Sequence, residues 1–230
     1  MEQGSLNSIV GPMASGKSRE VLSKLHQQEY NRTLNLPHKK VLLAKPLTDE
    51  RTQEVHTRDK NIKNVQPHKK FSHADELDSF VRESSSDHMV LVDELQFDVE
   101  GDIAKTLDEL ATDGYEIYAA FLPTSFTGWA FSEQAKDILA YSDSVSNLFA
   151  ICAVCEGEGA VKTMRLDKRG KPVAFDSKLV ELGFNYQPVC RKDHKIPGRP
   201  GLKFSKQLKD NGVGKLLVVS GPPSSGKTDV

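Results

Sequence analysis

The sequence predicts an α/β fold built on a parallel sheet, followed by a small metal-binding module. Three observations lead to this prediction. Apolar strand-like runs alternate with helical stretches, a GxxxxGK[ST] phosphate loop follows the first of these runs, and all three cysteines come after about residue 148, where this alternation ends. The chain has 230 residues, a net charge of −1 and three cysteines, an odd number that favours a reducing, cytoplasmic compartment.

Most elements of the sheet region can be read from the apolar pattern. Strands are expected over Leu6–Val10, Lys40–Ala44, Met89–Val92 and Glu116–Phe121. Helices are expected over Lys17–Tyr30 and Ile103–Ala111. Runs that are apolar throughout suit strands that are buried on both faces of a parallel sheet. The polar stretch Asp49–Lys70 has no apolar period and is expected to be a long loop.

The pattern changes after about Leu148. Short β-like pieces, Ala160–Leu166 and Pro172–Phe175, lie between the cysteines, and Lys195–Gly214 has the composition of a linker. The expected organisation is a phosphate-loop domain over residues 1–148, a zinc-binding domain over 149–195, and a linker with the start of a possible second unit over 196–230.

The phosphate loop predicts a binding site for ATP and Mg²⁺. It consists of Gly11, Pro12, Met13, Ala14, Ser15, Gly16, Lys17 and Ser18. Backbone N–H groups in such a loop turn inward around phosphate oxygens, and the following helix directs its positive end at them. Lys17 is expected to reach the β- and γ-phosphates, and the Ser18 hydroxyl to bind Mg²⁺.

Two carboxylates complete the pattern of a nucleotide site. Asp93 and Glu94 directly follow the apolar run Met89–Val92, so they are expected at the carboxyl end of a buried strand, where ligands bind in such sheets. Asp93 can hold Mg²⁺ through water, which leaves Glu94 to act as a base. A solvated strand end is the alternative for both acids.

The cysteines predict a closed zinc site. Cys152 and Cys155 form a C-x-x-C knuckle, and Cys190 precedes His194 by four positions. Three thiolates and one imidazole make a tetrahedral site without an open position, which is typical of structural zinc. His194 is the preferred fourth ligand and Asp193 the alternative; a set of free thiols is the other interpretation.

These motifs together resemble the type II thymidine kinases of cells, bacteria and phages, and especially the bacterial branch. The resemblance runs from about Leu6 to His194. It is carried by the GPMxSGKS form of the loop, by Asp93-Glu94-Leu95-Gln96-Phe97, by Phe121–Phe126 with Phe131, by Met164–Asp167, and by Tyr186 ahead of Cys190-Arg191-Lys192.

The resemblance implies a RecA-like domain, a zinc-bearing lasso domain, a homotetramer, and transfer of the ATP γ-phosphate to the 5′-hydroxyl of thymidine; deoxyuridine is the other candidate nucleoside. It implies Glu94 as general base and Asp93 as the acid associated with Mg²⁺. The remaining residues that it implies are Asp49 and Arg51 near the phosphates, Phe97, Phe126 and Phe131 around the nucleoside, and Thr163 and Tyr186 on the lasso side. From spacing alone, Phe97 is favoured as a core residue, and Phe126 and Phe131 stay undecided.

A second phosphate-loop motif, Gly221–Thr228, follows the apolar run Leu216–Ser220. It suggests the first unit of a tandem or fused protein. The alternative function is therefore a weak or inactive nucleotide-binding paralogue, and Ser125, in place of the aspartate of many bacterial relatives, motivates it. Near-zero charge argues against a nucleic-acid partner, and no apolar run reaches the roughly 18–20 residues that cross a bilayer.

Overall fold

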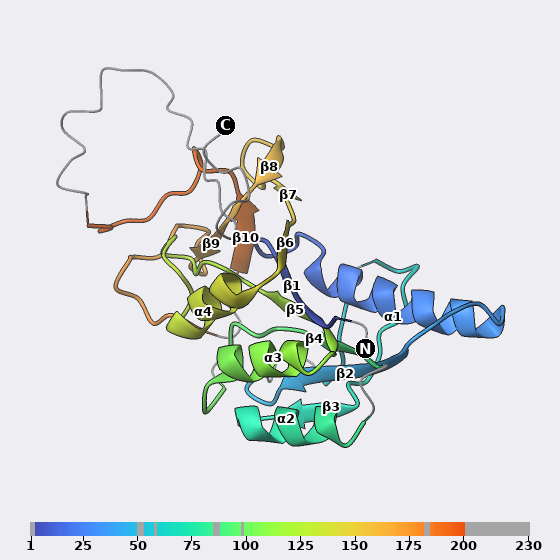
Figure 1. The fold of residues 1–230 in the computed structure, drawn as a ribbon. Coiled ribbons are helices and arrows are strands. Elements are labelled where there is room, and N and C mark those ends of the chain that lie inside the picture. Colours follow the sequence, from blue (N-terminus) through green and yellow to red (C-terminus); the bar gives the residue numbers. More distant parts are fainter. Residues whose placement is uncertain are drawn as a thin grey trace, which may run out of the picture. The chain divides into compact units, whose positions relative to one another are not determined.

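The computed structural model describes residues 3–49, 53–57, 59–84, 88–97, 99–181 and 185–200. Its main feature is a six-stranded sheet with the order β3-β2-β4-β5-β1-β6, in which every neighbouring pair is parallel (Figure 1). The strands are β1 (Ser5–Val10), β2 (Lys40–Pro46), β3 (Lys69–Phe71), β4 (His88–Val92), β5 (Glu116–Phe121) and β6 (Ser144–Asn147). The predicted parallel α/β fold is confirmed.

Helices cover both faces of this sheet. They are α1 (Lys17–Thr33), α2 (Ala74–Arg82), α3 (Ile103–Thr112) and α4 (Glu133–Tyr141). Helix α1 packs on one face, and the other three contribute to the apolar cluster on the opposite face. In β4, Val90 and Val92 belong to one cluster, whereas Met89 and Leu91 belong to the other. This alternation explains why the β4 sequence is apolar at consecutive positions.

Several elements were not evident from the sequence. Helices α2 and α4 are short, and β6 is an edge strand whose residues are all exposed, so its apolar signal is weak. The expectation of a long loop over Asp49–Lys70 is corrected in part. The residues Val55 and Val65 form an antiparallel bridge, Val55 is buried, and β3 begins at Lys69.

The segment after Leu148 contains two small antiparallel ribbons. Strand β7 (Ala150–Ile151) pairs with β8 (Glu158–Ala160), and β9 (Lys162–Leu166) pairs with β10 (Asn185–Val189). A small apolar cluster stabilises them, consisting of Cys152, Ala160, Met164, Leu166 and Val189. The expected strand over Pro172–Phe175 is only a single bridge between Leu166 and Pro172.

The ribbons and the parallel sheet belong to one compact unit that ends at Gly198. The second phosphate-loop motif, Gly221–Thr228, lies outside the described residues. Within the part of the chain that the structure describes, no helix has the length and apolar character needed to cross a bilayer.

The central strand generates a prediction about stability. Leu91 is completely buried in β4, so Leu91→Ala leaves a cavity and should lower the free energy of unfolding by about 2–5 kcal/mol. The same truncation at Leu36, a side chain that is 48% exposed, should have a much smaller effect. Urea unfolding of both variants checks this, and equal losses would contradict the assignment of β4 to the core.

Candidate active site

The phosphate loop connects the end of β1 to the start of α1, as its motif predicts. Gly16 adopts a left-handed backbone with φ +92°, and a Cβ at Gly11 would lie only 2.6 Å from the Leu148 carbonyl oxygen. Glycine is therefore required at both positions. Because no side chain caps the first turn of α1, the loop and the helix end have the form of an anion-binding site.

Two polar side chains of the loop, those of Lys17 and Ser15, are buried in positions where a bound phosphate could accept hydrogen bonds from them. Lys17 is buried, and its Nζ donates to the carbonyl oxygens of Gly11 at 3.1 Å and Pro12 at 2.8 Å. The Ser15 hydroxyl is buried and has no hydrogen-bond partner among the described residues. An unsatisfied buried hydroxyl is costly, and a phosphate oxygen would satisfy it. The loop therefore fits a phosphate group.

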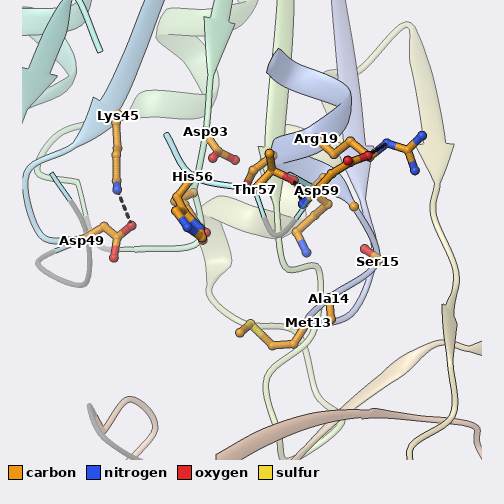
Figure 2. Close-up of a pocket in the computed structure, with 14 residues that line it drawn as sticks. Met13, Ala14, Ser15, Arg19, Lys45, Asp49, His56, Thr57, Asp59 and Asp93 are labelled. Carbon is orange, nitrogen blue, oxygen red and sulfur yellow. Dashed lines mark hydrogen bonds and ion pairs between the residues drawn. The ribbon is translucent and has the colours of Figure 1, made fainter. Parts of the chain in front are cut away.

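A cavity of about 530 Å³ lies in front of the loop. It is lined by Met13, Ala14, Ser15, Gly16, Lys17, Ser18, Arg19, Lys45, Asp49, His56, Thr57, Asp59, Asp93 and Glu94 (Figure 2). Parallel strands end at the same edge of the sheet, so β1, β2 and β4 deliver these side chains to one place. The predicted phosphate loop, Asp49, Asp93 and Glu94 are thus brought together.

Asp93 occupies the buried end of this cavity. It is only 2% exposed, and its carboxylate forms a hydrogen bond with Ser18. Burial, and then the negative charge of Glu94, raise its pKa to about 7, against the opposing effects of Ser18, Lys17 and Lys45. Paired serine and aspartate oxygens are suitable ligands for Mg²⁺, which would favour the ionised carboxylate.

Glu94 is held in an unusual conformation. Its φ of +63° lies in the left-handed region, which costs energy for a residue with a side chain. The Nε2 group of Gln96 donates to the Glu94 carboxylate, and the Gln96 Oε1 accepts from the Leu122 N–H at 3.0 Å. Gln96 is fully enclosed, at 1% exposure. A buried amide anchored to β5's end therefore orients the predicted base.

An ion pair that the sequence did not reveal borders the same cavity. Lys45 Nζ lies 2.8 Å from the Asp49 carboxylate, and both side chains are 2% exposed (Figure 2). Lys45 also donates to the Glu54 carbonyl oxygen at 3.2 Å. Lys45 lies at the carboxyl end of β2, just as Asp93 follows the carboxyl end of β4, and this position is the signal that could have indicated it. Arg51, the other predicted member of this segment, lies outside the described residues.

A segment that was expected to be a plain loop also reaches the cavity. His56, Thr57 and Asp59 line it, and Asp59 forms an ion pair with Arg19 of α1 at 3.3 Å. The bridge between Val55 and Val65 anchors this segment. Its contribution depends on contacts between residues that are far apart in the sequence, which explains why no local pattern indicated it.

The predicted nucleoside-contacting aromatics do not line this cavity. Phe126 is buried beneath the guanidinium group of Arg165, which lies 4.3 Å from the ring centroid. Phe131 packs against the core cluster, and Phe97 is partly buried, with its N–H donating to the Glu94 carbonyl oxygen at 3.2 Å. Ser125 is buried and its hydroxyl pairs with that of Thr127, so it stabilises the turn before Trp129.

The two lasso-side residues are engaged within the protein. The Thr163 hydroxyl accepts a hydrogen bond from the Met13 N–H of the phosphate loop at 3.0 Å. The Tyr186 hydroxyl contacts both the N–H and the carbonyl oxygen of Glu181 at 3.2 Å. Thr163 thus lies at the phosphate loop, whereas Tyr186 contacts the backbone of Glu181.

The cysteine cluster is formed, with a correction to its fourth member. The ligand atoms of Cys152, Cys155, Cys190 and Asp193 lie within 4.8 Å of one another. Asp193 Oδ2 is 3.4 Å from the Cys152 sulfur and 3.2 Å from the Cys190 sulfur. Tetrahedral zinc with Zn–S of about 2.3 Å and Zn–O of about 2.0 Å spaces its ligand atoms by about 3.5 Å. The cluster fits zinc.

His194, the preferred ligand from the sequence, points elsewhere. Its Nε2 lies 2.9 Å from the Phe126 carbonyl oxygen and 3.2 Å from the Thr163 carbonyl oxygen. Hydrogen bonds from the thiols, first Cys155 and then Cys190, lower the pKa of Asp193. The preference for His194 is therefore corrected in favour of Asp193.

The fold and this cavity define a phosphate-loop nucleotide-binding protein with an appended metal-binding cluster. Comparison with known proteins gives the family. The thymidine kinase family model matches residues 4–194. The thymidine kinase of Ureaplasma urealyticum serovar 10 is 31% identical over 210 residues, which cover 89% of this chain and 88% of that protein. This chain belongs to the thymidine kinase family.

Other comparisons are weaker. The thymidine kinase of Ureaplasma parvum serovar 3 is 29% identical over 228 residues, covering 90% of this chain and 94% of that protein. The X-ray structure of the Legionella pneumophila ATPase DotB has a TM-score of 0.38 and 17% identity, covering 69% of this chain and 44% of that one. That structural likeness is too low to inform the fold.

The metal cluster generates a test of its fourth ligand. Asp193→Ala removes a carboxylate from the cluster and should reduce zinc affinity, whereas His194→Ala removes a ring outside it and should retain zinc. Zinc content of the purified variants after dialysis against a competing chelator measures the difference. Retention by Asp193→Ala together with loss by His194→Ala would restore the original assignment.

Asp93 generates a prediction about pH. Its folded-state pKa of about 7 exceeds the ordinary value of 3.8, so the folded protein holds the proton more tightly than the unfolded chain. Stability should therefore fall as pH rises from about 4 to about 7, and the full penalty should remain above that range. Asp93→Asn should lack this component of the pH dependence. Urea unfolding without Mg²⁺ checks the difference, and parallel pH curves would contradict it.

Proposed function

We propose that this protein transfers the γ-phosphate of ATP to the 5′-hydroxyl of thymidine, with deoxyuridine as a second substrate, in cytoplasmic nucleotide salvage. The proposal rests above all on one observation: the phosphate loop, Asp93 and Glu94 face a single cavity. Phosphoryl transfer needs positioned phosphates, neutralised charge and a base near the attacking hydroxyl. The names of the relatives support thymidine as the nucleoside.

In the proposed reaction, the loop N–H groups and Lys17 hold the β- and γ-phosphates of ATP. Ser18 and Asp93 would hold Mg²⁺, which neutralises charge on the phosphate oxygens. Lys17 would then exchange its bonds to the Gly11 and Pro12 carbonyl oxygens for bonds to phosphate. This exchange keeps the buried ammonium group paired in both states.

Glu94 is proposed as the general base. The thymidine 5′-oxygen attacks the γ-phosphorus, the bond from that phosphorus to the β,γ-bridging oxygen breaks, and ADP leaves with the bond's electron pair. The hydroxyl proton passes to the Glu94 carboxylate. Gln96 is proposed to aim that carboxylate, since it donates to Glu94 and is itself fixed by the Leu122 N–H.

The second module is proposed to close one side of the nucleoside site. Structural zinc on Cys152, Cys155, Cys190 and Asp193 would stabilise a segment with only a small apolar cluster of its own. The substrate contacts implied by the resemblance are kept as proposals. Contacts with the phosphates are proposed for Asp49 and Arg51, and contacts with the nucleoside for Phe97, Phe126, Phe131, Thr163 and Tyr186. The division at 148/149 and a homotetrameric assembly are part of the same proposal.

The alternative of an inactive nucleotide-binding paralogue is less favoured. Lys17, Asp93 and Glu94 are all present and line one cavity, and Ser125 is used to stabilise a turn. Parallel assays of thymidine, deoxyuridine and deoxycytidine with ATP and Mg²⁺ test the proposal. Preferential turnover of thymidine supports it, and ATP binding without turnover of any nucleoside would favour the alternative.

The base assignment has its own test. Glu94→Gln keeps the size of the side chain but removes the proton acceptor, so turnover should fall by ~10²–10⁴-fold while ATP still binds. Glu109→Gln, the same change at an exposed residue of α3, is the matched control and should keep full turnover. Single-turnover kinetics measure the chemical step. Unchanged transfer in Glu94→Gln would remove Glu94 from this role.

A further inference from the structure

A continuous set of contacts joins the metal cluster to the phosphate loop. Asp193 belongs to the cluster, and the next residue, His194, reaches the carbonyl oxygens of Phe126 and Thr163. The Thr163 hydroxyl then accepts from the Met13 N–H in the phosphate loop. Asp193 and Met13, which are 180 positions apart in the sequence, are thus connected through the side chains of His194 and Thr163.

His194 serves this connection when its Nε2 carries a proton, as it does in one neutral tautomer and in the imidazolium form. Both partners of Nε2 are carbonyl oxygens, which only accept hydrogen bonds, so Nε2 must carry the proton. One N–H shared by two carbonyls ties the segment before α4 to strand β9. The Arg165 guanidinium, two positions along β9 from Thr163, stacks on Phe126 and reinforces the same junction.

The threonine fixes one N–H of the loop. Thr163 is 2% exposed, so water does not readily replace its hydroxyl as the acceptor for Met13. A loop that binds phosphate through backbone N–H groups depends on the direction of each peptide. The Met13 N–H belongs to the Pro12–Met13 peptide, so its bond to Thr163 fixes the peptide that precedes Met13 and Ala14, both of which line the phosphate cavity.

We propose that zinc in the Cys152/Cys155/Cys190/Asp193 cluster positions the phosphate loop for ATP through His194 and Thr163. Both are then positioning residues, in addition to any contact with the nucleoside. Zinc fixes Asp193, and through the backbone it restricts the position of the next residue, His194. The His194 ring then holds β9 by its hydrogen bond to the Thr163 carbonyl oxygen. In this position of β9, the Thr163 hydroxyl accepts from the Met13 N–H. The inference rests on the proposed function only in that the phosphate loop binds ATP.

The first test measures ATP–Mg²⁺ affinity by calorimetry with and without zinc. In the unsubstituted protein, removal of zinc by a chelator should weaken ATP binding by about 5- to 150-fold, the usual range for coupled sites. Thr163→Val removes the acceptor and should already bind ATP more weakly, with little further loss on chelation. Thr163→Ser keeps the hydroxyl and should retain the response to zinc.

Two results would overturn the proposal. One is unchanged ATP affinity in a folded, zinc-free protein, with folding verified by circular dichroism. The other is an equal response to chelation in Thr163→Val and in the unsubstituted chain, which would mean that Thr163 does not transmit the effect.

A second pair of variants decides the matter if the zinc-free protein unfolds. His194→Phe keeps a ring but removes the N–H donor, whereas His194→Gln keeps a donor. With zinc content and melting temperature equal to those of the unsubstituted protein, His194→Phe should bind ATP at least about 5-fold more weakly and His194→Gln should recover part of the loss. Full ATP affinity in His194→Phe would refute the role of His194.

These readouts are independent of the nucleoside. If thymidine is not phosphorylated but ATP affinity depends on zinc, His194 and Thr163, the proposed reaction fails and this inference stands. If thymidine is phosphorylated and ATP affinity is indifferent to zinc and to both substitutions, the reaction stands and the inference fails.

Discussion

The burial of Asp93 at the carboxyl edge of a parallel sheet is the constraint on which the site depends. A carboxyl group that is 2% exposed and lies beside Glu94 is costly to ionise, and its raised pKa reflects that cost. Ser18, Lys17 and Lys45 partly offset it. These groups come from the ends of neighbouring strands or from the first turn of α1. They therefore offset the cost of ionising Asp93 only when the sheet and the phosphate loop are both formed.

The other polar side chains in and around the cavity are likewise paired with one another. Lys45 and Asp49 neutralise each other out of water, and Gln96 satisfies both Glu94 and the Leu122 N–H. A buried polar group that lacks its partner is destabilising, so each of these contacts restricts the others. The positive φ of Glu94 is tolerated because the enclosed Gln96 and the end of β5 determine the local conformation.

The cysteine-bearing segment contributes more than a metal cluster. Its strand β9 supplies Thr163 to the phosphate loop, and His194 joins that strand to the turn that follows β5. The apolar cluster of this segment is small, so zinc on the four clustered residues would add to the stability that burial provides.

The sequence by itself determined the parallel α/β fold, the phosphate loop, the acids at the end of β4 and the three cysteines of the cluster. These features have local signals: continuous apolar runs, a glycine spacing, a strand followed by carboxylates, and a C-x-x-C pair. Only the tertiary structure decided that Asp193 rather than His194 belongs to the cluster, that Lys45 and Gln96 border the site, and that His56, Thr57 and Asp59 line its cavity. Those outcomes depend on side-chain direction and on pairing between distant residues, such as Val55 with Val65 or Thr163 with Met13. No spacing within one segment encodes such pairings, because they form when separate elements pack together.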